Sequence, residues 1–249
     1  MVQVSDLSWP EYAERVAGDP VVMVPCGALE QHGPHLPLGT DAILASAVSA
    51  GIAGGVGGLV LPALAYGYKS MPKSGGGAHF PGTTNLDGGT VVSMVRDIIR
   101  EQVRHGVRKL CFVVGHYENQ WFVTEGIDLA MREVGHTGVR IMRLEYWDFI
   151  EPQTIERVFP DGYPGAALEH AAVIETSLML HYQPHHVRLD RLPDHPSAEF
   201  PPYDMYPPHR HWVPSSGALT SAKAATAEKG RIMAEQFRDS IVAAVRKEF

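Results

Sequence analysis

The sequence predicts an α/β fold, in which helices cover both faces of a mostly parallel sheet. Short apolar runs, the first at residues 21–26, alternate along the chain with longer segments of helical periodicity. This rhythm is typical of parallel strands, which need helical crossovers between them. Nothing in the composition of the 249 residues marks an internal boundary, so we expect residues 1–249 to form a single domain.

The first half of the chain contains two helices and two strands by pattern. We expect a helix at 9–16 with Ser8 as its N-cap, a strand at 21–26, a helix at 41–53 and a strand at 59–64. Residues 66–89 then form a long irregular segment that contains aromatic residues and a histidine. Because loops longer than about 12 to 15 residues in compact domains are usually functional or disordered, and this one is rich in aromatics, we expect it to serve a functional site.

The second half continues the same alternation. The pattern predicts a helix at 90–105, a strand at 109–114, a helix at 121–134, a strand at 139–144, and helices at 168–180 and 221–247. The Pro-rich segment 193–214 contains too many aromatic residues for a free linker. We therefore expect it to lie against the domain or against a neighbouring subunit.

Composition excludes several classes of protein. The net charge is −7 and lysines and arginines are not clustered, which disfavours a nucleic-acid partner. No apolar run approaches the roughly 20 residues that span a bilayer, and the N-terminus lacks the pattern of a secretory signal, so we expect a cytoplasmic protein without a membrane partner. Cys26 and Cys111 lie in or beside apolar strands, where buried thiols are expected rather than a disulfide.

Residues 25–41 combine acidic and imidazole side chains directly after the first strand. Glu30 and His32 are two residues apart, and in extended backbone such residues point to the same side. Asp41 lies where the next helix begins. Two carboxylates and an imidazole that converge on one point suit a divalent transition metal.

A second cluster repeats this arrangement in the opposite order. His116 and Glu118 follow the strand at 109–114, and the carboxyl ends of parallel strands are where ligands bind in such sheets. Each residue by itself could be a loop cap or a solvated histidine, but the pairs Glu-x-His and His-x-Glu at two strand ends favour a shared metal site.

The charges of these candidate ligands favour two ions. Glu30, Asp41 and Glu118 bring three negative charges, and His32 and His116 are neutral when they bind metal. Two divalent ions with one bridging hydroxide balance these charges, whereas one ion leaves a negative charge in a low-dielectric cleft. Asp41, with two oxygens, is the natural bridge between ions about 3.5 to 4 Å apart.

Six motifs make the sequence resemble the creatininase (creatinine amidohydrolase) family over essentially its whole length. They are Gly-Ala-Leu-Glu-Gln-His-Gly at 27–33, Lys-Ser-Gly-Gly-Gly-x-His-Phe-Pro-Gly-Thr-Thr at 73–84, Gly-His-Tyr-Glu-Asn at 115–119, Tyr-Trp-Asp-Phe at 146–149, Glu-His at 169–170 and Glu-Thr-Ser-Leu-Met at 175–179. The resemblance implies a three-layer α/β/α sandwich with a mostly parallel sheet, which assembles as a homohexamer.

The resemblance also implies ligands for each of two metal ions. One ion, Mn or Zn, is expected on Glu30, Asp41 and His116, and a Zn ion on His32, Asp41 and Glu118. A water that bridges the ions is expected to attack the ring carbonyl of a lactam, with Glu118 steering it or accepting its proton. His170 is then expected to deliver a proton to the departing ring nitrogen.

The resemblance assigns the substrate contacts to four residues and departs from the family at two others. Tyr117 and Trp147 are expected to pack on a flat substrate, with Ser74 and Glu175 as polar partners. The Trp-Asp pair that flanks creatinine in the family is replaced by Ala166 and Ala167. Loss of an aromatic wall, worth on the order of 1 to 3 kcal/mol, is enough to change which substrate is preferred.

The sequence therefore predicts a dinuclear metal amidohydrolase that opens a cyclic amide, with creatinine as the leading small-molecule substrate. One alternative is hydrolysis of another small amide or a formamide, because of Ala166 and Ala167. A second alternative is a metal-binding protein without catalytic activity. A dehydrogenase is disfavoured because Gly75, Gly76 and Gly77 lack the helix-opening context of a dinucleotide-binding loop.

Overall fold

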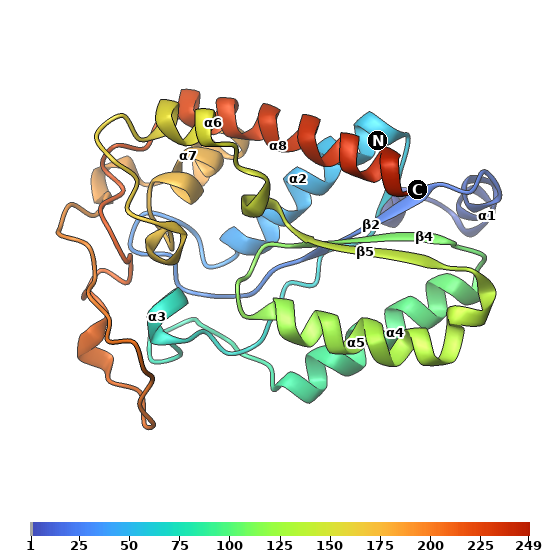
Figure 1. The fold of residues 1–249 in the computed structure, drawn as a ribbon, viewed down its shortest axis with the longest axis horizontal. Helices are drawn as coiled ribbons and strands as arrows, with labels where there is room; N and C mark the ends of the chain where they lie inside the picture. Colours follow the sequence, from blue (N-terminus) through green and yellow to red (C-terminus); the bar gives the residue numbers. More distant parts are fainter. Residues whose placement is uncertain (1) are drawn as a thin grey trace.

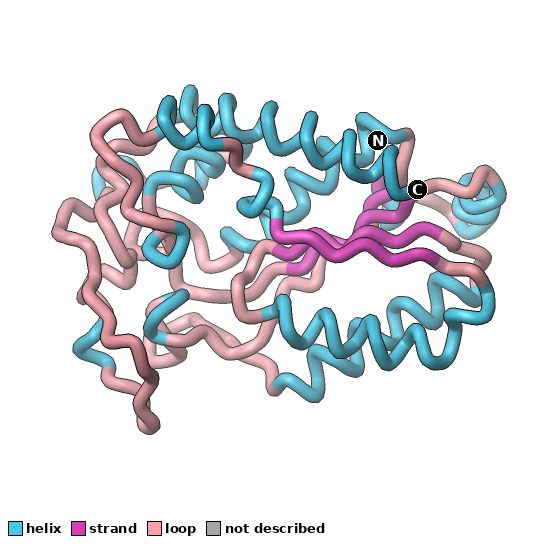
Figure 2. The backbone as a smooth tube through the Cα atoms, viewed as in Figure 1, coloured by secondary structure: helices cyan, strands magenta, loops and turns pink. Residues whose placement is uncertain are grey.

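A computed structural model describes residues 2–249 as one parallel sheet between two layers of helices (Figures 1 and 2). The sheet order is β1 (Val2–Gln3), β3 (Leu59–Val60), β2 (Val21–Cys26), β4 (Lys109–Val114) and β5 (Arg140–Glu145), and every pair is parallel. The predicted α/β/α class is therefore confirmed.

Two apolar cores lie on opposite faces of the sheet. One face is covered by α2 (Thr40–Val56), α6 (Pro152–Val158), α7 (Val173–Tyr182) and α8 (Ala227–Glu248), and the other by α1 (Trp9–Ala17), α4 (Gly88–Arg104) and α5 (Asn119–Val134). Successive residues of β2 alternate between the cores: Met23 packs under α2 and α8, whereas Val22 and Val24 pack on the side of α4 and α5. Because both faces are covered, the central strands are apolar throughout.

The topology places a switch point between β2 and β4. After β2 the chain passes through α2 to β3 on one side, and it then returns to β4 on the other side of β2. Ligands of doubly wound sheets bind at such a switch point, outside the carboxyl ends of the strands. Two glycines allow the start of α2 to lie directly over this switch point. A Cβ at Gly115 would lie 2.7 Å from Asp41 O, and a Cβ at Gly27 would overlap the backbone of Ala42.

Three predicted elements differ most in their bounds. The strand expected at 59–64 is regular only at Leu59–Val60, since Pro62 has no N–H to donate to a ladder. The helix expected at 168–180 begins at Val173, after a turn in which Ala171 has φ +53°. The helix expected at 221–247 begins at Ala227, where the Thr226 side chain accepts a hydrogen bond from Lys229 N.

One short strand and two short α-helices are absent from the sequence prediction. They are β1, α6 and α3 (Pro72–Gly75), the last of which lies inside the irregular segment 66–89. The segment 193–214 lies partly against the domain, through Lys73 and Asp204 at 3.6 Å and the hydrogen bond from Ala198 N to Leu219 O. Within residues 2–249, no helix is both long and apolar enough to cross a membrane.

Candidate metal centre

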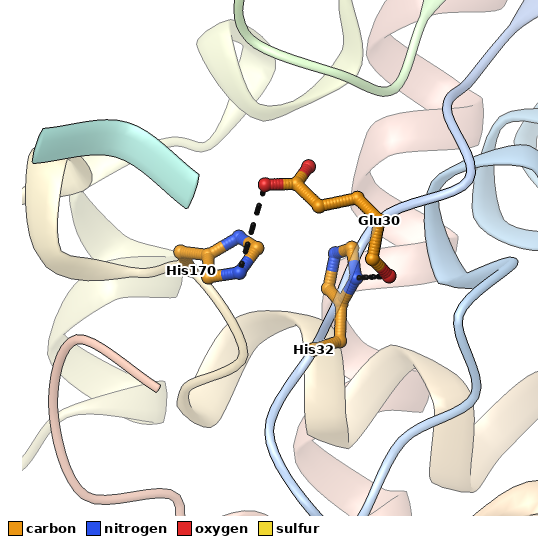
Figure 3. A group of neighbouring side chains, drawn as sticks. All are labelled: Glu30, His32 and His170. Atoms are coloured by element: carbon orange, nitrogen blue, oxygen red, sulfur yellow. Dashed lines mark hydrogen bonds and ion pairs between the residues drawn. The ribbon is translucent and has the colours of Figure 1, made fainter. Parts of the chain in front are cut away.

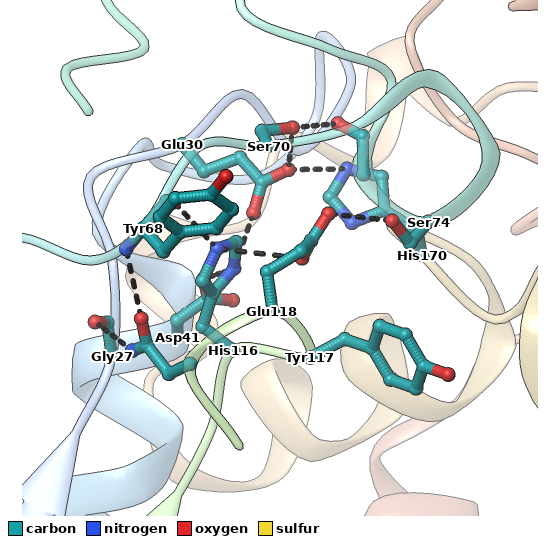
Figure 4. A network of polar contacts seen from close by, with 12 residues as sticks. Gly27, Glu30, Asp41, Tyr68, Ser70, Ser74, His116, Tyr117, Glu118 and His170 are labelled. Atoms are coloured by element: carbon teal, nitrogen blue, oxygen red, sulfur yellow. Dashed lines mark hydrogen bonds and ion pairs between the residues drawn. The ribbon is translucent and has the colours of Figure 1, made fainter. Parts of the chain in front are cut away.

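The five predicted metal ligands converge at the carboxyl ends of β2 and β4, at the end of the sheet opposite to the chain termini (Figure 1); Figure 3 shows His32 and Figure 4 the other four. All are buried, with relative exposures of 1% for Glu30, 1% for His32, 2% for Asp41, 3% for His116 and 2% for Glu118. Charged side chains are almost never this buried without a partner, so the cluster needs compensating charge.

His116 lies between two carboxylates. Its Nδ1 is 2.9 Å from Glu30 Oε2 and 3.2 Å from Asp41 Oδ2, and the three residues offer ligand atoms within 4.8 Å of one another. Its Nε2 lies 3.0 Å from Tyr68 O, to which it donates a hydrogen bond. That bond fixes the tautomer and leaves the Nδ1 lone pair for a cation, the usual arrangement of a metal-binding histidine.

His32 forms a second group with Asp41 and Glu175. Its Nε2 is 2.9 Å from Asp41 Oδ1 and 3.7 Å from Glu175 Oε1, and these three residues also offer atoms within 4.8 Å of one another. His32 Nδ1 donates to Glu30 O at 3.1 Å, which leaves Nε2 free to bind. The two oxygens of Asp41 thus face two different histidines.

The sequence analysis expected Glu118 beside His32 and Asp41, whereas the ligand atoms within 4.8 Å of one another there come from His32, Asp41 and Glu175. Glu118 Oε2 lies 3.4 Å from the outer nitrogen of His116, and its Oε1 accepts hydrogen bonds from Met71 N at 2.8 Å and Ser74 Oγ at 2.5 Å. The difference arises because Glu118 leads into α5 and turns toward the segment 66–89.

Three buried atoms of this cluster have no hydrogen-bond partner among residues 2–249: His32 Nε2, Asp41 Oδ2 and Glu118 Oε2. Such orphaned atoms are rare in proteins and indicate a missing ion or water. Their chemistry, imidazole nitrogen and carboxylate oxygen, fits a divalent zinc or manganese ion.

The electrostatics of the metal-free cluster lead to the same conclusion. Burial raises the pKa of Glu30 to about 7, against the opposing effect of His116. Burial alone lowers the pKa of His32, but the carboxylates of Asp41 and Glu175 outweigh it and hold that pKa well above its usual range. Protons therefore supply the positive charge that cations would otherwise bring, and metal binding would displace them.

His170 lies beside this cluster (Figure 3). Its ring centroid lies 4.5 Å from that of His32, with the two rings tilted by 43°, and its Nε2 is 3.9 Å from Glu30 Oε1. Burial lowers the pKa of His170 well below its ordinary value, with a further contribution from His32, so the imidazole is neutral. The same three residues form the third group of potential ligand atoms within 4.8 Å.

The predicted substrate contacts lie in different environments. Ser74 is held by Glu118, and Tyr117 is 48% exposed at the edge of the cluster, with Trp121 edge-to-face at 5.4 Å. Trp147 is half-buried in the turn Tyr146–Phe149 and packs against both apolar cores. Ala166 and Ala167 are exposed in a single turn before His170.

The sequence analysis missed Ser70, whose hydroxyl donates to Glu30 Oε1 and lies 2.9 Å from Gly75 O. It also missed Asn119, which receives a hydrogen bond from Tyr68 N and donates to Gly27 O, both at 2.9 Å. The only sequence signal for Ser70 is its place in the long segment 66–89. The predicted burial of Cys26 and Cys111 is confirmed, and it raises the pKa of the Cys111 thiol to about 12.

The fold and the cluster together define an α/β/α protein with a carboxylate and histidine metal site at the switch point of a parallel sheet. The Creatininase family profile, described as "Creatinine amidohydrolase", matches residues 5–245. The chain is 51% identical to the creatinine amidohydrolase of Pseudomonas putida, over 100% of this chain and 97% of that protein. The chain therefore belongs to the creatininase family.

Further relatives show how the family varies. The structure "Creatininase Mn" has a TM-score of 0.97 and 50% identity over 100% of this chain and 98% of the other, and a Zn-Zn type creatininase variant gives 0.97 and 50% over 99% and 98%. A mycofactocin precursor peptide peptidase of Mycobacterium tuberculosis (strain CDC 1551 / Oshkosh) is 30% identical over 92% of this chain and 85% of that protein. The relatives of this chain thus include a creatinine amidohydrolase and a peptide peptidase, by their descriptions.

Proposed function

We propose that this protein is a metal-dependent amidohydrolase that opens a cyclic amide, with creatinine, hydrolysed to creatine, as the leading substrate. The observation that carries the proposal is the group of buried Glu30, His32, Asp41 and His116 with partly buried Glu175, in which ligand atoms of His32 and Asp41 have no hydrogen-bond partner. The 51% identity to the Pseudomonas putida creatinine amidohydrolase supports the substrate class.

Two ions fit the ligand groups. Glu30, Asp41 and His116 would hold one, Zn or Mn, and His32, Asp41 and Glu175 would hold the other, Zn, with Asp41 shared. This proposal replaces Glu118 by Glu175 in the second set. Bound there, the ions supply Lewis acidity, which lowers the pKa of water from 15.7 toward about 7 and polarises an amide carbonyl.

Glu118 is the proposed general base. One of its oxygens is held by the backbone N–H of Met71 and the hydroxyl of Ser74, and the other, Oε2, is buried without a hydrogen-bond partner beside His116. The held oxygen fixes the orientation of the carboxylate, and the unpartnered oxygen is available to take a proton from the attacking water.

His170 is the proposed proton donor to the departing ring nitrogen. Burial lowers its pKa, so the ring is neutral, and its Nε2 lies 3.9 Å from Glu30 Oε1. The neutral ring would first accept the proton that Glu118 takes from the attacking water, and the imidazolium so formed would pass a proton to the departing nitrogen as the carbon–nitrogen bond breaks, so that no nitrogen anion has to leave.

A second candidate is hydrolysis of another small amide or a formamide. Ala166 and Ala167 are exposed and leave one side of the site without the aromatic wall expected from the family, while Tyr117, with 48% exposure, and Trp147 remain as flat contacts. Without an aromatic wall the site would admit ligands that stack less tightly, and the 30% identical relative is described as a peptide peptidase.

The test compares turnover of creatinine, hydantoin, formamides and short peptide amides by the protein loaded with Zn or Mn. Glu118→Gln and His170→Ala should each abolish turnover of the preferred substrate, whereas the exposed residues Glu125 and His136 provide the matched controls Glu125→Gln and His136→Ala, which should not. If the parent protein turns over none of these amides, it is a metal-binding protein without this catalysis; if the parent is active and both site variants keep full activity, the roles proposed for Glu118 and His170 are wrong.

Three further expectations remain part of the proposal. We treat residues 1–249 as one domain, because the two apolar cores share a single sheet, so unfolding should show one transition. A homohexamer is tested by light scattering on the purified protein. A cytoplasmic location is tested by cell fractionation.

A further inference from the structure

Gln31 is a buried glutamine between two proposed ligands, and the proposed chemistry gives it no role. It is 5% exposed, and its Nε2 donates to Gly75 O at 3.0 Å and to Gly217 O at 2.9 Å. Its Oε1 accepts from Gly33 N at 2.9 Å, and its Nε2 also lies 3.0 Å from His170 Nε2. One side chain thus joins segments that are far apart in the sequence.

The orientation of this carboxamide follows from its partners. A rotated amide would place Oε1 against two carbonyl oxygens and its N–H groups against the N–H of Gly33, so only the observed orientation satisfies both ends. Both N–H groups of Gln31 are then used by carbonyls. Gln31 therefore has no hydrogen left to donate to His170.

The same count of donors and acceptors shows which ring nitrogen of His170 carries the hydrogen. Its Nε2 lies 2.9 Å from the main-chain oxygen of Gln31, which can only accept. His170 Nε2 must therefore carry the hydrogen and donate it to Gln31 O. Leu219 N donates to the main-chain oxygen of His170 at 3.1 Å, so the histidine is held from both its ring and its backbone.

The backbone approaches the carboxamide of Gln31 so closely at two glycines that no side chain fits there. Gly76 has φ +79° and Gly217 has φ +84°, and a Cβ on either would overlap the amide group of Gln31. Left-handed backbone in close approach requires glycine at both positions. Two separate loops are thus shaped to enclose this side chain.

We infer that Gln31 is a positioning residue: its carboxamide ties α3 and the loop of Gly217 around the imidazole, and its main-chain oxygen holds the His170 Nε2 proton at the edge of the metal cluster. The inference rests on the proposed function insofar as His170 is the proton donor. Loss of the carboxamide should let the ring move without removing a ligand.

The first test is Gln31→Met, which keeps the length of the side chain and removes its hydrogen bonds. We expect kcat to fall about 10- to 100-fold, since a displacement of about 1 Å can cost on the order of 100-fold. KM should change less than about threefold and the zinc content per chain should stay the same. Gln236→Met is the matched control, because Gln236 also donates two hydrogen bonds, to Phe149 O and Ser240 Oγ, on α8.

The second variant displaces Gln31 without changing it. Gly217→Ala adds a methyl group that would overlap the Gln31 carboxamide, whereas Gly138→Ala adds one at φ +78° with nothing within 4 Å and controls for backbone strain. We expect Gly217→Ala to lower kcat as Gln31→Met does. The double variant should be no worse than either single variant, because both remove one interaction.

A spectroscopic readout separates positioning from a general structural effect. Long-range proton–nitrogen correlation spectra of zinc-loaded protein labelled on histidine nitrogen should show His170 as the Nε2–H tautomer, assigned by its loss in His170→Gln. In Gln31→Met these signals should shift or broaden.

Two results would overturn the inference: unchanged His170 signals with kcat within twofold of the parent, or a loss of zinc that parallels the loss of activity. If the parent protein opens no cyclic amide, the proposed function fails, and the His170 signals alone still decide the role of Gln31.

Discussion

Replacement of Glu169 by glutamine should change how stability depends on pH. Burial raises the pKa of Glu169 to about 8 from an ordinary 4.5, although its Oε2 accepts a hydrogen bond from Ile174 N at 2.8 Å, and its Oε1 is buried without a partner. The folded protein therefore keeps this carboxyl group protonated at pH values where the unfolded chain ionises it.

The sign and size of the change in the free energy of unfolding with pH follow from proton linkage. The unfolded state binds fewer protons than the folded state between pH 4.5 and 8, so this residue lowers the free energy of unfolding as the pH rises through that window. The free energy of unfolding falls by about 1.4 kcal/mol per pH unit and by on the order of 4 to 5 kcal/mol over the whole window. Below pH 4.5 Glu169 is protonated in both states and does not change the free energy of unfolding.

Glu169→Gln removes this ionisation and keeps an oxygen for Ile174 N. We expect the variant and the parent to have similar stability at pH 5, and the variant to be more stable at pH 8 by several kcal/mol, measured by urea denaturation at pH 5, 6, 7 and 8. Glu151→Gln, at an exposed glutamate, is the control and should follow the parent. Parallel pH curves for Glu169→Gln and the parent would refute the reasoning.

The remaining predictions concern the metals, the thiols and the open wall of the site. A chelator should abolish hydrolysis and lower the thermal midpoint, and re-added zinc at 100 times its Kd should restore about 2.7 kcal/mol of stability. His32→Ala should lose about one metal ion per chain, measured by mass spectrometry of metals, because the group of Glu30, Asp41 and His116 remains. Cys26 and Cys111 should not react with an aromatic disulfide reagent until the protein unfolds, because both are fully buried and burial raises the pKa of both thiols. Ala166→Trp should raise kcat/KM for creatinine over a formamide by roughly 5- to 100-fold, corresponding to about 1 to 3 kcal/mol of stacking; an unchanged ratio would contradict the assignment of the open wall.

The local pattern of apolar side chains was enough to predict several helices and strands. The apolar runs that became β2 and β4, and the amphipathic α4, were predicted to within about two residues, because periodicity of apolar side chains reflects which face is buried. The pairs at 30 and 32 and at 116 and 118 were found for the same reason, since each follows a strand directly. Helix starts were less predictable: before α7 the chain leaves the helical conformation at Ala171, which is left-handed, and at Ala172, and no residue type in the sequence marks this turn.

The sequence by itself determined the class of fold, the two strand ends that carry acid and imidazole pairs, and the family. Only the tertiary structure decided which carboxylate joins which histidine, because Glu175 reaches His32 through the packing of α7 on the same face of the sheet as α2, across more than a hundred residues of chain. The enclosure of Gln31 by the loops of Gly75 and Gly217 was likewise decided only there. Spacing along a chain reports neighbours on one element, whereas contacts between elements depend on how the layers pack, and no local pattern contains that information.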